Sequence, residues 1–218
     1  MYRLLASVAL VAVTVRPVSG QEQGRDTTLA AARESRAAAS AGLDTLRALA
    51  REHSAALGFG AGEAAGAVLG EPLVEFYVRL DSLRAFTSTT NPASLLSGGD
   101  KVMYPVMAGG KTRSSIEVDH ARDGWRPVAY GGQGLARNIV EQRERVAAAD
   151  KKALADYFLV RVPSLGLVFI GVHSGGSLNL TPLLDDPAGR WKAGATMPAA
   201  TVFGALVADA RASKGLPI

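Results

Sequence analysis

Apolar and polar residues alternate with a period of two in several segments of the C-terminal two thirds of the chain. In residues 72–80, Val74, Phe76 and Val78 fall on one side and Glu75 and Tyr77 on the other. Residues 112–119 repeat the pattern. Because successive side chains of a strand point to opposite faces, this alternation predicts half-buried strands.

The same reading gives a complete order of elements. Helical spacing of apolar residues recurs in 134–149 and again between Thr196 and Gly215, and an alanine-rich helical pattern covers 25–57. Short turns join most strands, which favours antiparallel pairing. We therefore predict an α+β fold: a mostly antiparallel sheet of six to seven strands with two helices packed on one face, preceded by an Ala-rich N-terminal helix. The expected strands are 72–80, 101–108, 112–119, 125–130, 156–162, 165–172 and 178–184.

The N-terminal region has the pattern of an export signal. Arg3 precedes an apolar run at 4–15, and small residues follow at 18–20. We predict a signal peptide at 1–20, a helical arm at 21–57, a Gly-rich linker at 58–70 and an α+β domain at 71–218. A buried N-terminal strand or core helix, or an uncleaved anchor, are the alternatives. The apolar run is shorter than the roughly 20 residues that a membrane span requires. Cleavage would remove this run and leave no stable membrane span.

Charge and cysteine content exclude several classes of protein. The chain has 24 Lys and Arg against 20 Asp and Glu, and removal of Arg3 and Arg16 with the signal lowers its net charge from +4 to +2. Basic residues are scattered rather than clustered, so we expect no nucleic-acid partner. The absence of cysteine excludes disulfides and thiolate chemistry.

Residues that carry catalytic chemistry are few. The three histidines have no second ligand at metal-binding spacing, so we expect no metal and no cofactor. The stretch HSGGS places His173 beside Ser174 and Ser177, with Asp185 and Asp186 further along, and a serine-type hydrolase is the alternative function. A hairpin turn between two apolar strands explains the same glycines, and we assign no catalytic residue.

The remaining candidate is a surface for binding. Methionine and aromatic residues are favoured where a surface adapts to a partner, and arginines frequently accompany them. The competing interpretation is that these side chains lie beneath a helix. The candidate residues are Met103, Met107, Arg113, Trp125, Arg126, Tyr130 and Trp191.

These observations predict an exported, non-catalytic binding or accessory module of the bacterial envelope or exterior. We expect it to be exported by the general secretory machinery to the periplasm or the medium, and to engage an envelope protein, a peptide or a small ligand through its sheet. Docking of a partner through the N-terminal helix is a third possibility.

Overall fold

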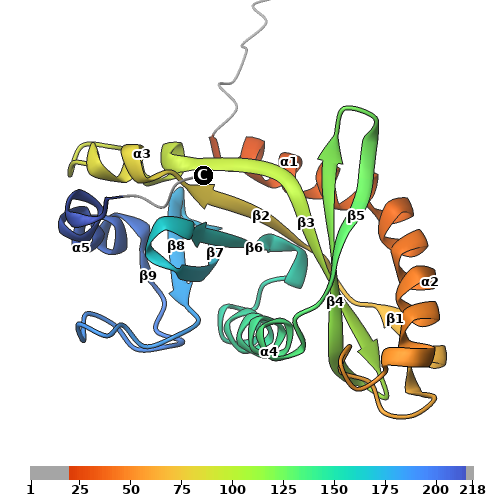
Figure 1. Ribbon diagram of the computed structural model, residues 1–218. Helices are drawn as coiled ribbons and strands as arrows, with labels where there is room; N and C mark the ends of the chain where they lie inside the picture. The colour runs from red at the N-terminus through yellow and green to blue at the C-terminus, as the bar shows by residue number, and fades with distance from the viewer. Residues whose placement is uncertain (1–19, 215–218) are drawn as a thin grey trace, which may run out of the picture.

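The computed structural model describes residues 20–214 and shows one nine-stranded sheet with five α-helices in that range (Figure 1). The predicted signal peptide lies outside the described residues, apart from Gly20. The helices are α1 (Gly20–Glu34), α2 (Arg36–His53), α3 (Leu80–Arg84), α4 (Gln133–Asp150) and α5 (Ala199–Ala212). The strands are β1 (Val68–Leu69), β2 (Leu73–Val78), β3 (Leu96–Ala108), β4 (Lys111–Ala121), β5 (Gly124–Gly131), β6 (Tyr157–Val162), β7 (Leu167–Ser174), β8 (Ser177–Pro182) and β9 (Met197–Pro198).

The sheet is mixed but mostly antiparallel, and its strand order is β5-β4-β3-β2-β6-β7-β8-β9, with β1 paired to β3. The pairing of β2 with β6 is parallel, and it joins two antiparallel halves. All seven predicted strands are present as β2 to β8. The two-residue strands β1 and β9 raise the number above the six or seven expected, because segments this short leave no alternation to read.

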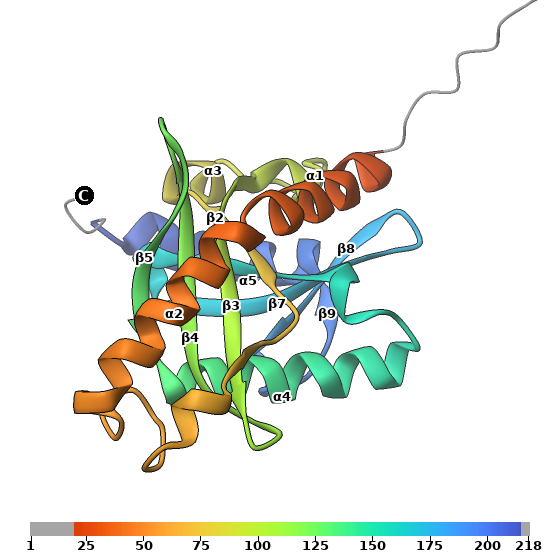
Figure 2. The ribbon, with the colours of Figure 1, turned by 90° about the vertical axis from the view of Figure 1, so that its right-hand side faces the viewer.

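Helices cover both faces of the sheet, so the prediction of two helices on one face is wrong (Figures 1 and 2). Val74 and Val78 of β2 belong to the cores beneath α1, α2, α3 and α5, whereas Leu73 packs on the other face with α4. The physical reason is that β6 is apolar on both faces: Leu159 packs on the α4 side and Val160 on the opposite side. A strand of this kind requires cover twice.

The Ala-rich segment packs directly on the sheet. It forms two helices that meet at Ser35, whose hydroxyl donates to the Ala31 carbonyl at 2.6 Å and lies 2.9 Å from the Tyr104 hydroxyl. Tyr104, fully buried on β3, donates in turn to the Ala32 carbonyl at 2.6 Å. Serine hydroxyls that bond back to the preceding turn often bend helices. The bend lets α1 and α2 follow the twisted face (Figure 2).

Small residues let this layer approach the sheet closely. A Cβ at Gly42 of α2 would lie 3.1 Å from side-chain atoms of Ile116 and Pro127. The Gly-rich segment that follows buries Phe59 and Ala64 in the same core. The regions expected to form an arm and a linker therefore share a hydrophobic core with β2, β3 and β4.

An arginine positions α4 on the opposite face. Arg143 is buried, and its guanidinium donates to the carbonyls of Glu71 and Pro72 at 3.1 and 3.0 Å. Burial lowers the pKa of Arg143 to about 10, which leaves it charged at neutral pH. These bonds connect the middle of α4 to the residues just before β2.

Candidate binding surfaces

The seven residues selected from the sequence do not form one surface. Met103 is buried beside α4, and Trp191 is buried in the core that contains α5. Trp125 and Tyr130 are partly buried and pack on the opposite face, against the core formed with α1 and α2. For Met103 and Trp191 the structure shows the competing arrangement, in which the side chain is covered.

Met107 and Arg113 both line one pocket, at the end of the β3–β4 hairpin. Together with α4 they line a hairpin pocket of about 460 Å³. The Arg113 guanidinium is already paired with Glu63. Its Nη2 and Nε atoms lie 2.6 and 2.8 Å from Glu63 Oε1. The other charged residues that line this pocket are Lys111, Arg137, Glu141 and Glu144. It is therefore lined by both signs of charge.

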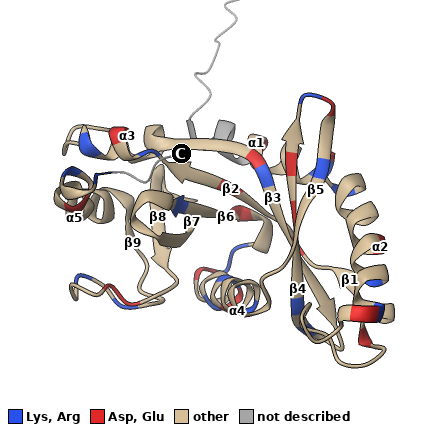
Figure 3. Cartoon of the chain, viewed as in Figure 1, with Lys and Arg blue, Asp and Glu red and all other residues tan. Residues whose placement is uncertain are grey.

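The α4 face of the sheet continues beyond the area that α4 covers, and there it carries a row of alternating charges. Leu73, Met103 and Leu159 pack with α4. Two positions away on the same strands, and so on the same face, lie the charged residues Glu75, Lys101 and Arg161. Figure 3 shows basic and acidic stretches side by side on β3, β4 and β5. We define the charge row as Arg161, Glu75, Lys101, Glu117, Asp119 and Arg126, from β6 across β2, β3 and β4 to β5.

Ion pairs hold the charge row in place. Arg161 Nε lies 2.7 Å from Glu75 Oε2, and Lys101 Nζ lies 3.9 Å from Glu117 and 3.7 Å from Asp119. Burial raises the pKa of the Glu75 carboxyl, and the charge of Arg161 opposes that shift. Arg126, opposite Asp119 on the edge strand β5, is exposed. The row therefore runs from a half-buried pair at the centre of the sheet to an exposed end.

The HSGGS segment forms the β7–β8 hairpin, in which Ser174 pairs with Ser177. The His173 ring packs against Phe158, with centroids 5.4 Å apart, and Lys152 Nζ donates to the His173 carbonyl at 2.6 Å. Burial, with the nearby Lys152 charge, lowers the pKa of the His173 imidazole. Its ring is occupied by packing on an aromatic neighbour, which is not the geometry of a base beside a nucleophile.

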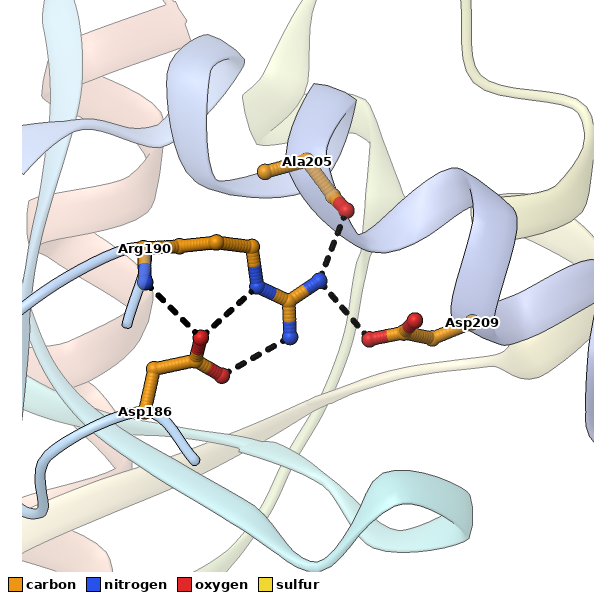
Figure 4. Close-up of polar contacts among 4 residues, drawn as sticks. All are labelled: Asp186, Arg190, Ala205 and Asp209. Atoms are coloured by element: carbon orange, nitrogen blue, oxygen red, sulfur yellow. Dashed lines mark hydrogen bonds and ion pairs between the residues drawn. The ribbon is translucent and has the colours of Figure 1, made fainter. Parts of the chain in front are cut away.

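The two aspartates that could have oriented this histidine are bound within their own loop. Asp185 accepts from the Ala193 amide at 2.8 Å and from Lys192 at 3.0 Å. Asp186 accepts two bonds from the Arg190 guanidinium, at 2.9 and 2.8 Å, and one from its amide at 3.0 Å (Figure 4). Arg190 also pairs with Asp209 of α5 at 2.8 Å. These carboxylates hold the 183–196 loop against α5.

Residues 20–214 contain no group of three or more His, Cys, Asp or Glu side chains able to hold a metal ion. Among the same residues, no helix has the length and apolar character needed to cross a membrane. No protein-family model, curated protein or solved structure matches the chain. Any functional assignment therefore depends on the surfaces themselves.

Proposed function

We propose that the chain is an exported, non-catalytic binding or accessory module of the bacterial envelope or exterior, and that it engages a protein partner through the charge row on its sheet. The observation that carries the proposal is the open part of the α4 face. There, alternating charges are arranged across five strands, and Tyr77 lies beside Arg161 with 40% of its surface exposed. The proposed site, like the one expected from the sequence, is on the sheet, and of the seven residues selected from the sequence it includes only Arg126.

Alternating charge suits selection of a partner better than general adhesion. The three acids and three bases of the row cancel in net charge, so the row exerts little long-range attraction on a uniformly charged surface. A partner with the complementary sequence of charges gains at each position, and a shifted one meets like charges. Because neighbouring ion pairs restrain the central side chains, the pattern is formed before binding, which reduces the entropic cost of association.

The proposal is tested by reversing the exposed end of the row. We would use the mature chain to capture a partner from a bacterial envelope fraction and then measure affinity for that purified partner. Arg126→Glu should weaken binding at least tenfold, and Lys101→Glu should act in the same direction. Arg51→Glu, which reverses an exposed arginine on α2, is the matched control and should bind as the unaltered chain does.

Two results would overturn the proposal. One is unchanged affinity of both charge-row variants, with thermal unfolding showing that they are folded. The other is equal loss of binding in the Arg51 control. Export is tested separately, by expressing the full chain and determining the N-terminus of the extracytoplasmic product. It should begin near residue 21, and Val11→Arg within the apolar run should retain the chain inside the cell.

A further inference from the structure

A second hollow lies on the other face of the sheet, beside α1. It has a volume of about 410 Å³ and opens widely to the surface. The sheet contributes Asp100 from β3, His120 from β4 and Trp125 from β5, and α1 contributes Glu34. We call this the acidic-aromatic pocket. It is independent of the charge row, whose side chains point to the α4 face.

The aromatic wall of the pocket is made by neighbouring strands. His120 and Trp125 are register partners across the β4–β5 hairpin, and their rings lie edge to face with centroids 5.0 Å apart. The Trp125 Nε1 atom is buried and has no hydrogen-bond partner among the described residues. Trp125 lines the hollow, and among aromatic side chains an indole ring interacts best with a cation.

The charged residues of the pocket are both acids. Glu34 and Asp100 are exposed, and within residues 20–214 neither side chain forms a hydrogen bond or an ion pair. Among the residues that the structure describes, no lysine or arginine lines the pocket, in contrast to the hairpin pocket with its Lys111, Arg113 and Arg137. Two carboxylates beside an aromatic wall, without an internal cation, form a site of negative potential.

Two glycines of β3 line the pocket, and at Gly99 no side chain stands between the sheet and α1. Gly98 and Gly99 have φ values of +109° and +96°, a region that other residues rarely adopt. A Cβ at Gly99 would lie 3.4 Å from the Phe76 ring and 3.7 Å from Thr27 of α1, which also lines the hollow. The lack of a side chain at Gly99 thus leaves room between α1 and the sheet.

From this combination we infer that the acidic-aromatic pocket binds an organic cation, namely an ammonium or guanidinium group. Its volume exceeds what a bare metal ion needs, and its aromatic wall would add nothing to coordination of a hard cation by oxygen. An alkyl chain ending in a positive charge satisfies both parts of the site: its charge meets Glu34 and Asp100, and its methylenes pack on Trp125. A lysine or arginine side chain of a peptide has this chemistry, and so does a free diamine.

The test follows the two tryptophans by their indole N–H resonances in ¹⁵N-labelled protein. The probes are the capped tripeptides Gly-Lys-Gly and Gly-Arg-Gly, the neutral tripeptide Gly-Gln-Gly, and putrescine. At low salt, the cationic probes should shift the Trp125 resonance with a dissociation constant of about 1 mM or tighter. The buried Trp191 is an internal reference and should not move. Binding of peptides alone indicates a peptide partner, and binding of putrescine as well shows that the cation suffices.

Variants separate the contribution of each wall. Glu34→Gln together with Asp100→Asn should weaken binding at least tenfold, and Trp125→Phe should weaken it less, because an aromatic face remains. Asp44→Asn, on the exposed surface of α2 and outside both the pocket and the charge row, is the matched control and should bind normally. The carboxylate variants change exposed groups and should stay folded. The test therefore does not depend on a substitution of the partly buried Trp125.

Three results would overturn the inference. The first is a Trp125 resonance that stays unchanged up to about 10 mM of every cationic probe at low salt, a concentration at which even a millimolar site would be mostly occupied. The second is equal binding of the neutral tripeptide. The third is retention of affinity in the double carboxylate variant.

Discussion

The two faces of the sheet differ in how they are completed. On the α1–α2 face, β3 contributes Val102, Tyr104 and Val106, all buried beneath the N-terminal helices. On the other face, Met103 packs with α4, but Lys101 two positions earlier belongs to the charge row. One face is therefore covered along most of β3, whereas the other changes from apolar to charged within a single strand.

This difference shows that the boundary between core and open surface is set by single positions in each strand. Helix α4 covers only the apolar part of its face, since burial of unpaired charge beneath a helix would cost several kcal/mol. The N-terminal helices cover an apolar surface and contribute little to the charged one. If this view is correct, mutations should have large effects in the covered core and small effects in the charge row.

The largest expected effect is in the covered core. Leu46 of α2 is fully buried against the sheet, so Leu46→Ala should lower the free energy of unfolding by about 2–5 kcal/mol. Leu49→Ala, on the same helix but 42% exposed, should change it by less than about 0.5 kcal/mol. Urea denaturation of both variants measures the contrast. A loss below about 1 kcal/mol for Leu46→Ala would mean that α2 is a detachable arm.

Much of the fold could be predicted from the sequence pattern, but the faces of the sheet on which the helices pack could not. The seven longer strands were predictable, some from apolar residues at every second position, as in 72–80 and 112–119, and others from short apolar runs bounded by turns. Val160 and Leu159 show why helix placement failed: consecutive apolar residues indicate cover on both faces but do not say which helix supplies it. The alanines of 25–57 gave helix propensity without showing that Tyr104 and Ser35 would join this segment to β3.

An intermediate effect is expected where a buried carboxylate holds the C-terminal loop. Arg190 lowers the pKa of Asp186 to about 2 from an unfolded value of 3.8. A depressed carboxyl pKa stabilises the fold above the unfolded pKa, and the contribution is lost as pH falls from about 4 toward 2. It amounts to roughly 2 kcal/mol at pH 7. Asp186→Asn should be less stable by about this amount, with a flatter pH dependence between pH 4 and 2 in thermal unfolding.

The control for this effect is another aspartate–arginine pair on a helix surface. Asp44 pairs with Arg47 at 2.9 Å, but its side chain is 77% exposed. Asp44→Asn should therefore change stability by no more than about 0.5 kcal/mol at any of these pH values. Equal effects of the two substitutions would show that burial of Asp186 does not strengthen its bonds.

The candidate sites were less predictable than the fold, because they depend on which strands become neighbours. Glu75 and Tyr77 were recognisable as the polar side of their strand. That Glu75 lies beside Arg161 depends on the parallel pairing of β2 with β6, which no local pattern indicates. The contact of His120 with Trp125 follows from a hairpin and could have been inferred, whereas the approach of Glu34 required the position of α1.

The smallest expected effects lie within the charge row itself, where they decide how far its pattern is formed before binding. The Arg161–Glu75 pair is short, and its side chains are only 22% and 12% exposed, so a double-mutant cycle with Arg161→Gln and Glu75→Gln should give a coupling of about 1 kcal/mol. The Lys101–Asp119 pair is longer, with side chains 35% and 38% exposed, and its coupling should be a few tenths of a kcal/mol, falling further in salt. A stronger coupling for the first pair than for the second would mean that the charged side chains are held in place at the centre of the sheet and are more mobile toward β5. Couplings near zero for both pairs would describe freely solvated side chains, and the open face would then lack the preformed pattern on which partner selection depends.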